Sequence, residues 1–402
     1  ILRMFKKSSL EKQVDKVPKE VIWCKKCTIS NQRPRIIFNA VGICSGCTNT
    51  ENKKKINWEE REKELVELLN KHRSKNGNYD VIVPSSGGKD SNYVAHILKN
   101  KYKMNPLTVT WSPLSYTTIG RTNHNAMIGS GFNNVLFTPN GITQRTLARL
   151  CFEELGDAFH VFVMGQFCYP FHIALQMGIK LVFYGENGEL EYAGDPVLKD
   201  KAFKPFELFK YHHFKGVTLD ELINYGIENK QYVKDNIKNL SSSDLNFYKL
   251  PKIENLLEKG IAGKHFFSYY HEWIPQENYY YASQNTGFRA NSVRSEGTYS
   301  KYASLDDKMD GFHYYLRYIK FGLGRCSEDT AHEIRDGHIT REEGVNLMKK
   351  FEGEFPSKYF NEFLNYLNIT EKEFEEIVDE WRPQHLWNKT NKGWDLKKPI
   401  SS

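Results

Sequence analysis

The sequence has 402 residues, which is enough for two or three domains. Charged residues make up 26% of it and aromatic residues 14%, which excludes a low-complexity or disordered chain. No apolar run approaches the roughly 18 residues that a membrane-spanning helix needs, and residues 1–20 contain no apolar signal core. We therefore expect a soluble globular protein without a membrane partner.

The charge is distributed unevenly along the chain. The 56 basic and 49 acidic residues give a net charge of +7, but residues 1–75 hold 18 basic against 9 acidic side chains, and the remainder holds 38 against 40. Such a basic segment can attract a polyanion, so charge alone leaves a nucleic-acid partner open. We predict that residues 1–20 form a flexible basic tail.

Four of the seven cysteines form two pairs, Cys24-x2-Cys27 and Cys44-x2-Cys47, which are separated by sixteen residues. Two tight turns at this spacing can bring four sulfurs to one tetrahedral zinc ion. Four thiolates close the coordination shell, so the pattern predicts a structural zinc ribbon over 21–50, with a short strand at 35–39. Paired thiolates in place of a disulfide framework indicate a reducing compartment, the cytoplasm.

The next segment, 51–78, is predicted as a linker helix that begins with Asn57 as N-cap and Glu60 at N3. From residue 79, short apolar runs at 79–83, 107–111, 134–137 and 180–184 alternate with helical stretches. This alternation predicts an α/β domain over 79–200, with a doubly wound parallel sheet covered on both faces. Helical signals dominate 201–402, including the capping boxes Thr340/Glu343 and Thr370/Glu373.

A short loop follows directly after the predicted strand at 79–83. It reads Pro84-Ser85-Ser86-Gly87-Gly88-Lys89-Asp90-Ser91 and leads into a predicted helix at 92–100. Small residues at such a turn let backbone N–H groups approach an anion closely, and the helix N-terminus adds a partial positive charge. The spacing fits neither the Walker A loop nor the dinucleotide-binding glycine turn. The loop therefore predicts a phosphate cradle, in which Lys89 supplies a point charge and Asp90 a magnesium ligand.

Residues 86–91 resemble the SGGxDS motif of the PP-loop ATP pyrophosphatases. This resemblance implies a PP-loop (HUP-like) fold that binds the β,γ-pyrophosphate of ATP, adenylates a carbonyl-type oxygen and releases AMP. Within that superfamily, residues 23–355 are similar to the N-acetyl sugar amidotransferases, which convert an acetamido group of a bacterial surface sugar into an acetamidino group. The similarity is carried by the cysteine pairs and by residues 184–189, 297–302, 306–308, 313–315, 318–322, 324–325 and 331–335.

The ends of the predicted strands supply further candidates. Residues 185–195 carry four carboxylates, which are natural ligands of a magnesium ion. The alternative is a solvated acidic loop. Thr110 and Trp111 could contact adenine, although Trp111 could equally belong to the core. Residues 305–320 are predicted as an amphipathic helix whose polar side is either a solvent face laced with ion pairs or, through Lys320 and Arg325, a phosphate-binding surface.

The predicted site can be stated by role. The residues expected to bind ATP are Ser86, Gly87, Gly88, Lys89, Asp90, Ser91, Thr110, Trp111, Gly185 and Asn187. The residues expected to act in catalysis are Lys89, Asp90, Glu186, Lys320 and Arg325, and the magnesium ligands are Asp90 and Glu186. The expected cofactors are ATP, Mg²⁺ and Zn²⁺.

Three functions compete for these features. The first is an ATP-dependent amidotransferase that acts on a nucleotide-linked or free acetamido sugar and takes ammonia from a separate glutaminase subunit. The second is a PP-loop tRNA thiolase, which generally needs further cysteines for sulfur transfer, whereas Cys151, Cys168 and Cys326 are scattered. The third is a non-catalytic binding module. The near-neutral body of the chain is a poor surface for tRNA, so we expect no nucleic-acid partner.

Overall fold

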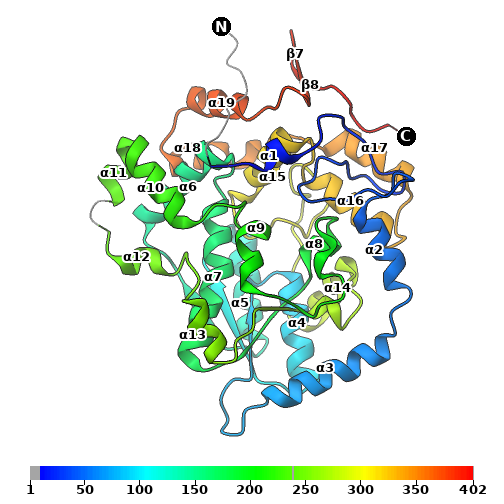
Figure 1. Cartoon of the computed structure of the whole chain (residues 1–402), viewed down its shortest axis with the longest axis vertical. Coiled ribbons are helices and arrows are strands. Elements are labelled where there is room, and N and C mark those ends of the chain that lie inside the picture. The colour runs from blue at the N-terminus through cyan, green and yellow to red at the C-terminus, as the bar shows by residue number, and fades with distance from the viewer. Residues whose placement is uncertain (1–9, 238–239, 402) are drawn as a thin grey trace.

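The computed structural model describes residues 10–237 and 240–401 (Figure 1). Its main sheet has six strands in the order β3-β2-β1-β4-β6-β5. The strands are β1 (Val81–Pro84), β2 (Pro106–Trp111), β3 (Asn134–Phe137), β4 (Leu181–Tyr184), β5 (Phe203–Lys204) and β6 (Lys264–Phe266). Neighbours from β3 to β6 pair in parallel, and β5 runs antiparallel to β6. The predicted α/β class, with a mostly parallel sheet, is therefore confirmed.

Both faces of this sheet are buried. Ile82 and Val182 point into one hydrophobic core, with helices α6 (Gly141–Leu155) and α7 (His160–Met177). Their neighbours Val81 and Leu181 point into a second core, with α3 (Trp58–His72) and α4 (Lys89–Asn100). Successive side chains of a strand face opposite sides, so continuous apolar runs are expected where helices cover both faces.

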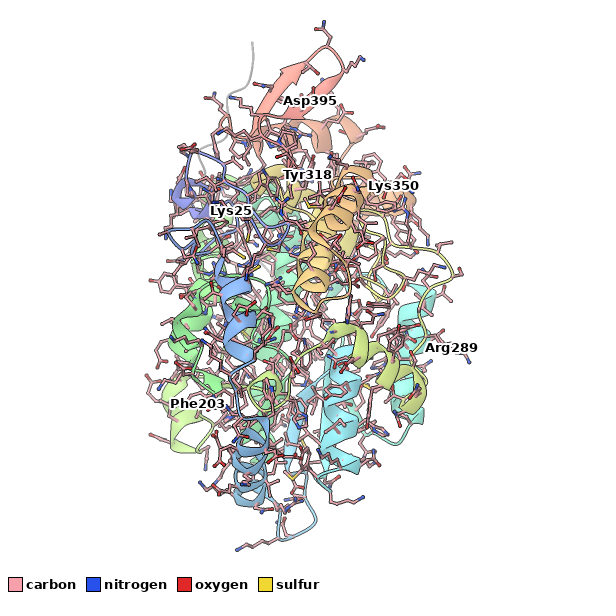
Figure 2. The ribbon with its side chains drawn as sticks, turned by 90° about the vertical axis from the view of Figure 1, so that its right-hand side faces the viewer. Lys25, Phe203, Arg289, Tyr318, Lys350 and Asp395 are labelled. Atoms are coloured by element: carbon pink, nitrogen blue, oxygen red, sulfur yellow. The ribbon has the colours of Figure 1, made fainter. Side chains whose placement is uncertain are left out.

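The remaining elements complete the chain. Besides α3, α4, α6 and α7, the helices that precede β5 are α1 (Gln13–Lys16), α2 (Ser45–Lys53), α5 (Thr118–Gly129) and α8 (Gly188–Glu191). Those that follow are α9 (Phe209–His212), α10 (Leu219–Asn229), α11 (Gln231–Ile237), α12 (Ser242–Asn246), α13 (Ile253–Glu258), α14 (Pro275–Asn285), α15 (Asp310–Phe321), α16 (Arg325–Arg335), α17 (Arg341–Phe351), α18 (Phe360–Leu367) and α19 (Glu371–Glu380). Strands β7 (Trp387–Thr390) and β8 (Gly393–Leu396) form a separate hairpin, which carries Asp395 at the top of Figure 2. Short 3₁₀ turns occupy Pro196–Leu198, Phe206–Leu208, Phe267–Tyr269 and Ser357–Tyr359.

Several local predictions are confirmed by the caps. The Asn57 side chain accepts a hydrogen bond from the Glu60 N–H at the start of α3. Complete capping boxes begin α17 at Thr340 and α19 at Thr370. Residues 35–39, predicted as a strand, form only an isolated bridge between Phe38 and Cys44, so that prediction is wrong. Strands β5 and β6 extend the sheet into the region predicted as helical.

The N-terminal segment packs on the body of the protein. Residues 1–9, the first part of the predicted flexible tail, lie outside the described residues. Val14 and Val17 are buried against Phe321 at the end of α15. The described part of the tail is therefore held in place, because its apolar residues cover an aromatic side chain that would otherwise be exposed.

None of the described helices has by itself the length and apolarity that a membrane span requires. Helices α6 and α7 meet that criterion only as a pair, and the chain bends by 119° between them.

Candidate active site

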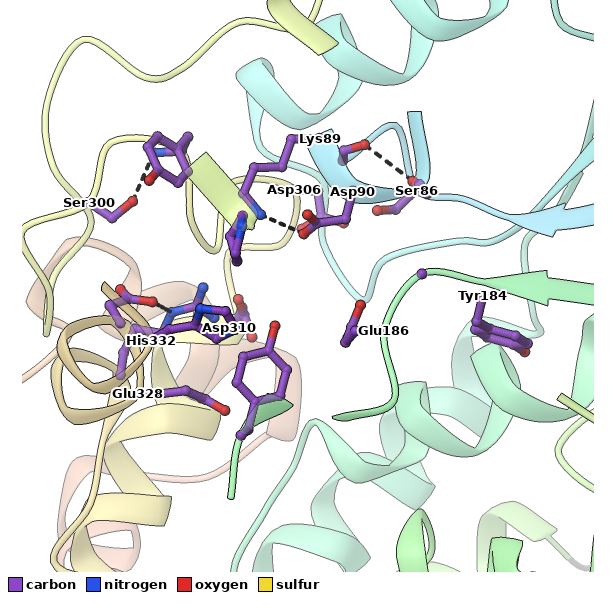
Figure 3. Close-up of a pocket in the computed structure, with 18 of the residues that line it drawn as sticks. Ser86, Lys89, Asp90, Tyr184, Glu186, Ser300, Asp306, Asp310, Glu328 and His332 are labelled. Atoms are coloured by element: carbon purple, nitrogen blue, oxygen red, sulfur yellow. Dashed lines mark hydrogen bonds and ion pairs between the residues drawn. The ribbon is translucent and has the colours of Figure 1, made fainter. Parts of the chain in front are cut away.

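The loop between β1 and α4 forms the floor of a cavity of about 440 Å³ (Figure 3). Gly87 has a φ of +87°, and a Cβ atom there would lie 2.7 Å from the backbone of His124. The Gly87 N–H donates to the Ser85 hydroxyl, which lies 2.8 Å from the Ser91 hydroxyl. The loop is thus closed on itself by short side chains, with the N-terminus of α4 facing the cavity.

Carboxylates gather beside this loop. The ammonium group of Lys89 pairs with Asp90, whose other oxygen accepts a hydrogen bond from Asn278 of α14. Glu186 lies just past the end of β4 and lines the same cavity. Burial raises the pKa of Glu186, and the negative charge of Asp90 raises it further. Two carboxylates that destabilise each other's charge are a suitable setting for a divalent cation, so Asp90 and Glu186 fit the predicted magnesium ligands.

The opposite wall comes from the last third of the chain. Asp310 lines it at the start of α15, and α16 contributes Arg325, Glu328 and His332, whereas Asp306, which precedes α15, lies beside the loop near Asp90 and Ser86 (Figure 3). Burial raises the pKa of Asp306 to about 6, helped by the charge of Asp310. The cavity therefore lies between the carboxyl ends of the sheet strands and a helical wall, the usual position of a ligand site in an open α/β sheet.

Arg325 is held in place within this wall. Its guanidinium donates to the Tyr314 hydroxyl at 2.6 Å and to Asp329 at 3.0 Å. The neighbouring Glu328 pairs with Arg317 at 2.6 Å. Burial by itself raises the pKa of Glu328, but Arg317, Arg325 and Arg33 outweigh burial and lower it to about 2. A fixed, charged arginine at a cavity wall is well suited to a phosphate or carboxylate.

The structure brings most of the predicted site residues together. The cavity is lined by Ser86, Gly88, Lys89, Asp90, Ser91, Trp111, Gly185, Glu186 and Arg325. Thr110 instead bonds to the Ser85 carbonyl and to Asn134 behind the loop. Asn187 is buried next to Glu186 and is not among the lining residues, although its side-chain amide lacks a hydrogen-bond partner.

Lys320 does not join this cavity. Its ammonium group donates to the Leu155 carbonyl at 2.8 Å and lies 3.7 Å from Glu11. It lines a second cavity instead. The predicted pairing of Lys320 with Arg325 on one ligand therefore fails, because Gly322 (φ +66°) ends α15 and turns the chain between them.

The predicted cluster of carboxylates after β4 is also dispersed. Glu189 forms an ion pair with Arg35 at 2.6 Å, and Glu191 forms one with Lys53 at 2.6 Å. Asp195 accepts a hydrogen bond from the Val197 N–H and lies 3.3 Å from His212. Of the four carboxylates, only Glu186 lines the first cavity. The prediction that several of these carboxylates share one magnesium ion is therefore wrong, and so is the alternative that they form a solvated acidic loop.

Sequence reasoning missed Asn278 and Tyr192. Asn278 reaches Asp90 from 188 positions away, and Tyr192 lines both cavities. Neither residue lies in a motif, so no local signal pointed to them.

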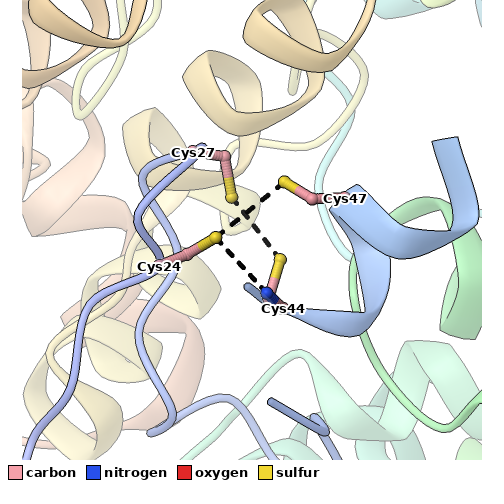
Figure 4. A group of neighbouring side chains, drawn as sticks. All are labelled: Cys24, Cys27, Cys44 and Cys47. Carbon is pink, nitrogen blue, oxygen red and sulfur yellow. Dashed lines mark hydrogen bonds between the residues drawn. The ribbon is translucent and has the colours of Figure 1, made fainter. Parts of the chain in front are cut away.

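The four paired cysteines form a compact buried cluster (Figure 4). Their sulfurs all lie within 4.8 Å of one another. The Cys24–Cys47 and Cys27–Cys44 sulfur distances are 3.9 and 3.6 Å, close to the roughly 3.8 Å expected around a tetrahedral ion with zinc–sulfur bonds. The cluster can therefore hold one metal ion, as a zinc ribbon would.

This cluster supports the cavity wall from behind. Thr28, next to Cys27, shares a 2.8 Å hydrogen bond with Thr330 of α16. Helix α2 starts just after Cys44, and its Lys53 pairs with Glu191, which lies 3.3 Å from His332 in the cavity wall. The cysteine cluster therefore supports the fold, and its residues do not line the cavity.

Comparison with known proteins gives two matches. Residues 296–400 match the model of the C-terminal domain of WbpG-like lipopolysaccharide biosynthesis proteins. An uncharacterized protein of Methanocaldococcus jannaschii, MJ1599, is 37% identical over 87 residues, which are 21% of this chain and 31% of that protein. The chain thus matches less than a third of the length of this curated relative. The domain match begins at the helical wall of the cavity, and it supports a role in glycan biosynthesis.

Proposed function

We propose that the chain is an ATP-dependent amidotransferase that adenylates the acetamido group of a sugar and replaces its oxygen with ammonia. The observation that carries this proposal is the cavity itself. A glycine-rich anion loop forms one side, and a domain similar to that of lipopolysaccharide biosynthesis proteins forms the other. ATP and a glycan precursor would then meet between these two walls.

The loop suits the triphosphate of ATP. Ser86, Gly88 and Lys89 line the cavity at the N-terminus of α4, and both a helix N-terminus and an ammonium group favour an anion beside them. Trp111 ends β2 at the cavity, but its side chain is only 3% exposed and packs in the core against Tyr169, so adenine would contact backbone groups there. Asp90 and Glu186 would hold Mg²⁺, which supplies charge neutralisation on the phosphates.

Adenylation suits an acetamido group because its oxygen is a poor leaving group. Once that oxygen carries AMP, ammonia adds to the carbon and AMP departs with the oxygen. Arg325 can stabilise the departing phosphate, since it is held rigidly by Asp329 and Tyr314. The reaction requires little acid–base chemistry from the protein, and the charged side chains that line the cavity would act mainly on the phosphates.

The tRNA thiolase has less support. Sulfur transfer needs a reactive thiolate, but Cys151, Cys168 and Cys326 are buried. Burial raises the pKa of each of these thiols. Cys24, Cys27, Cys44 and Cys47 belong to the metal cluster. No thiol among the described residues is therefore suited to carry sulfur to a substrate.

The test is product analysis with a panel of acetamido nucleotide sugars, ammonium salt and ATP, with tRNA as a separate substrate. We expect AMP and pyrophosphate together with an amidine. Asp90→Ala should abolish AMP formation and Lys89→Ala should weaken it, whereas Lys99→Ala, on the same helix outside the cavity, should not. ADP as the primary product, or wild-type turnover by Asp90→Ala, would refute the proposal.

A further inference from the structure

A second cavity of about 300 Å³ adjoins the first, and Glu186 and Tyr192 line both. It lies between the edge of the sheet at β5, the N-terminal ribbon and the end of α15. Cations dominate its lining: Arg33, Arg35, Lys204, Lys215, Lys264, Arg317 and Lys320. The carboxylates that line it are Asp157, Glu186 and Glu189.

Most of these cations are already neutralised by a carboxylate. Arg35 pairs with Glu189 at 2.6 Å, and Lys215 pairs with Asp157 at 3.0 Å. Arg317 and Lys320 pair with Glu328 and Glu11. The ion pairs among the described residues leave out Lys204, Lys264 and Arg33.

Lys204 and Lys264 are opposite each other on neighbouring strands. They are register partners on β5 and β6, and only 1% and 5% of their surfaces are exposed. The Lys204 ammonium group shares a 3.3 Å hydrogen bond with Nε2 of His213, a neutral base that brings no negative charge. The Lys264 ammonium group lies 4.5 Å from the centroids of the Phe167 and Tyr184 rings.

Such an arrangement is costly unless a negative charge completes it. Burying one unpaired ammonium group costs several kcal/mol, and two that face the same cavity repel each other as well. The buried Nε of Arg33, on the ribbon side, has no hydrogen-bond partner in the described structure. Three buried donors thus surround one space with a deficit of negative charge.

We propose that this second cavity binds an oxyanion, a carboxylate or a phosphate, which belongs to the sugar substrate of the first cavity. The anion would accept hydrogen bonds from Lys204 and Lys264 and from Arg33. The assignment of this anion to the sugar substrate rests on the proposed function, whereas the anion site itself does not. Because Glu186 borders both cavities, a sugar anchored here would extend toward the loop that holds ATP.

The electrostatics of the two lysines agree with this proposal. Burial lowers the pKa of Lys204 to about 6, and the charge of Lys264 lowers it further. Burial also lowers the pKa of Lys264 to about 8. A bound oxyanion would restore the charged form of both side chains, since an opposite charge nearby favours it.

The experiment is anion binding to the full chain, measured by calorimetry and thermal unfolding, with inorganic phosphate or acetate against chloride at equal ionic strength. All measurements are made in a chain that carries Lys89→Ala, because this substitution suppresses phosphate binding at the ATP loop. The variants are Lys204→Met and Lys264→Met, which keep the apolar stem, and Lys201→Met is the control because it removes an exposed charge from the same segment.

We expect the parent chain to bind one anion and to unfold at a higher temperature when the anion is bound. In each of the two variants, the affinity should fall by roughly tenfold or more and the rise in unfolding temperature should shrink, whereas Lys201→Met should behave like the parent chain. Without the anion, the two variants should be at least as stable as the parent chain, because each replaces a buried amine, whose pKa burial already lowers, by an apolar side chain. Preference for acetate would indicate an acidic sugar, and preference for phosphate a phosphorylated or nucleotide-linked one.

Anion binding that is absent, or that is equal in the parent and both variants, would overturn the site. Anion binding that depends on both lysines, in a chain that forms no AMP, would uphold the site and refute the proposed function instead.

Discussion

Gly87 offers a sharp test of the loop geometry because its neighbour Gly88 is a matched control. At Gly87, φ is +87°, and an added Cβ would lie 2.7 Å from the Cα and N atoms of His124 and 2.9 Å from the carbonyl carbon of Asn123. All three atoms are backbone atoms of α5, so none can rotate away. At Gly88, φ is −72°, and the nearest atom to an added Cβ is the Ser86 hydroxyl oxygen at 3.6 Å.

The expected cost of Gly87→Ala has two parts. A left-handed backbone conformation costs a residue with a Cβ about 1–2 kcal/mol. Overlap with a well-packed backbone costs about 1–3 kcal/mol more, which gives about 2–5 kcal/mol in total. Gly88→Ala replaces an N-cap glycine by alanine in an allowed conformation, so it should cost about 1 kcal/mol.

Denaturant unfolding of the two variants measures this difference directly, and AMP formation measures its effect on the loop. We expect Gly87→Ala to lose either stability or AMP formation, since the strain is relieved only by unfolding or by a shift of the loop. If Gly87→Ala matches Gly88→Ala in its free energy of unfolding and keeps wild-type AMP formation, the described loop geometry is wrong.

Three further predictions concern metal, pH and ammonia. Elemental analysis should find one zinc per chain, and Cys24→Ser should impair folding rather than catalysis alone; a folded zinc-free variant, or an iron–sulfur absorption band, would contradict this. The lowered pKa of Glu328, about 2 against an ordinary 4.5, should contribute about 3 kcal/mol of stability above pH 4.5 that is lost as the pH falls toward 2. The free energies of unfolding at pH 7 and pH 3 should therefore differ more for the wild type than for Glu328→Gln, by about 2 kcal/mol, and equal differences would count against the ion pair. The purified chain should use ammonium salts but not glutamine, because its cysteines lack the setting of a glutaminase nucleophile, and glutamine-supported turnover by the contaminant-free chain would refute this.

Local sequence patterns predicted those parts of the site whose residues are close together in the sequence. The loop at 84–91 and the two cysteine pairs are short, and their spacing determines which atoms converge. The four strands before residue 200 were found because each is a short apolar run; three of them are buried, and β3, at the edge of the sheet, is half-buried. Strands β5 and β6 span only two and three residues, too few for any periodicity to show.

The other parts of the site depend on contacts between residues that are far apart in the sequence or separated by a turn, and these contacts could not be inferred from the sequence. Glu189 and Glu191 had the composition of a metal site, but basic residues from the first sixty positions, Arg35 and Lys53, neutralise them. Lys320 and Arg325 are five positions apart, yet one left-handed residue, Gly322, separates them into different cavities.

The contact between the cysteine cluster and α16 has a consequence for biosynthesis. Thr28 and Thr330 are 302 positions apart, and the Trp23 indole donates to the Lys398 carbonyl across 375 positions. A segment that is synthesised early therefore waits for one synthesised about 300 residues later before its outer surface is covered. Contacts of such separation slow folding, and until they form the helical wall of the cavity lacks the support of the ribbon. Zinc bound early would keep the N-terminal ribbon folded during this interval, so the metal would protect the nascent chain before it stabilises the finished protein.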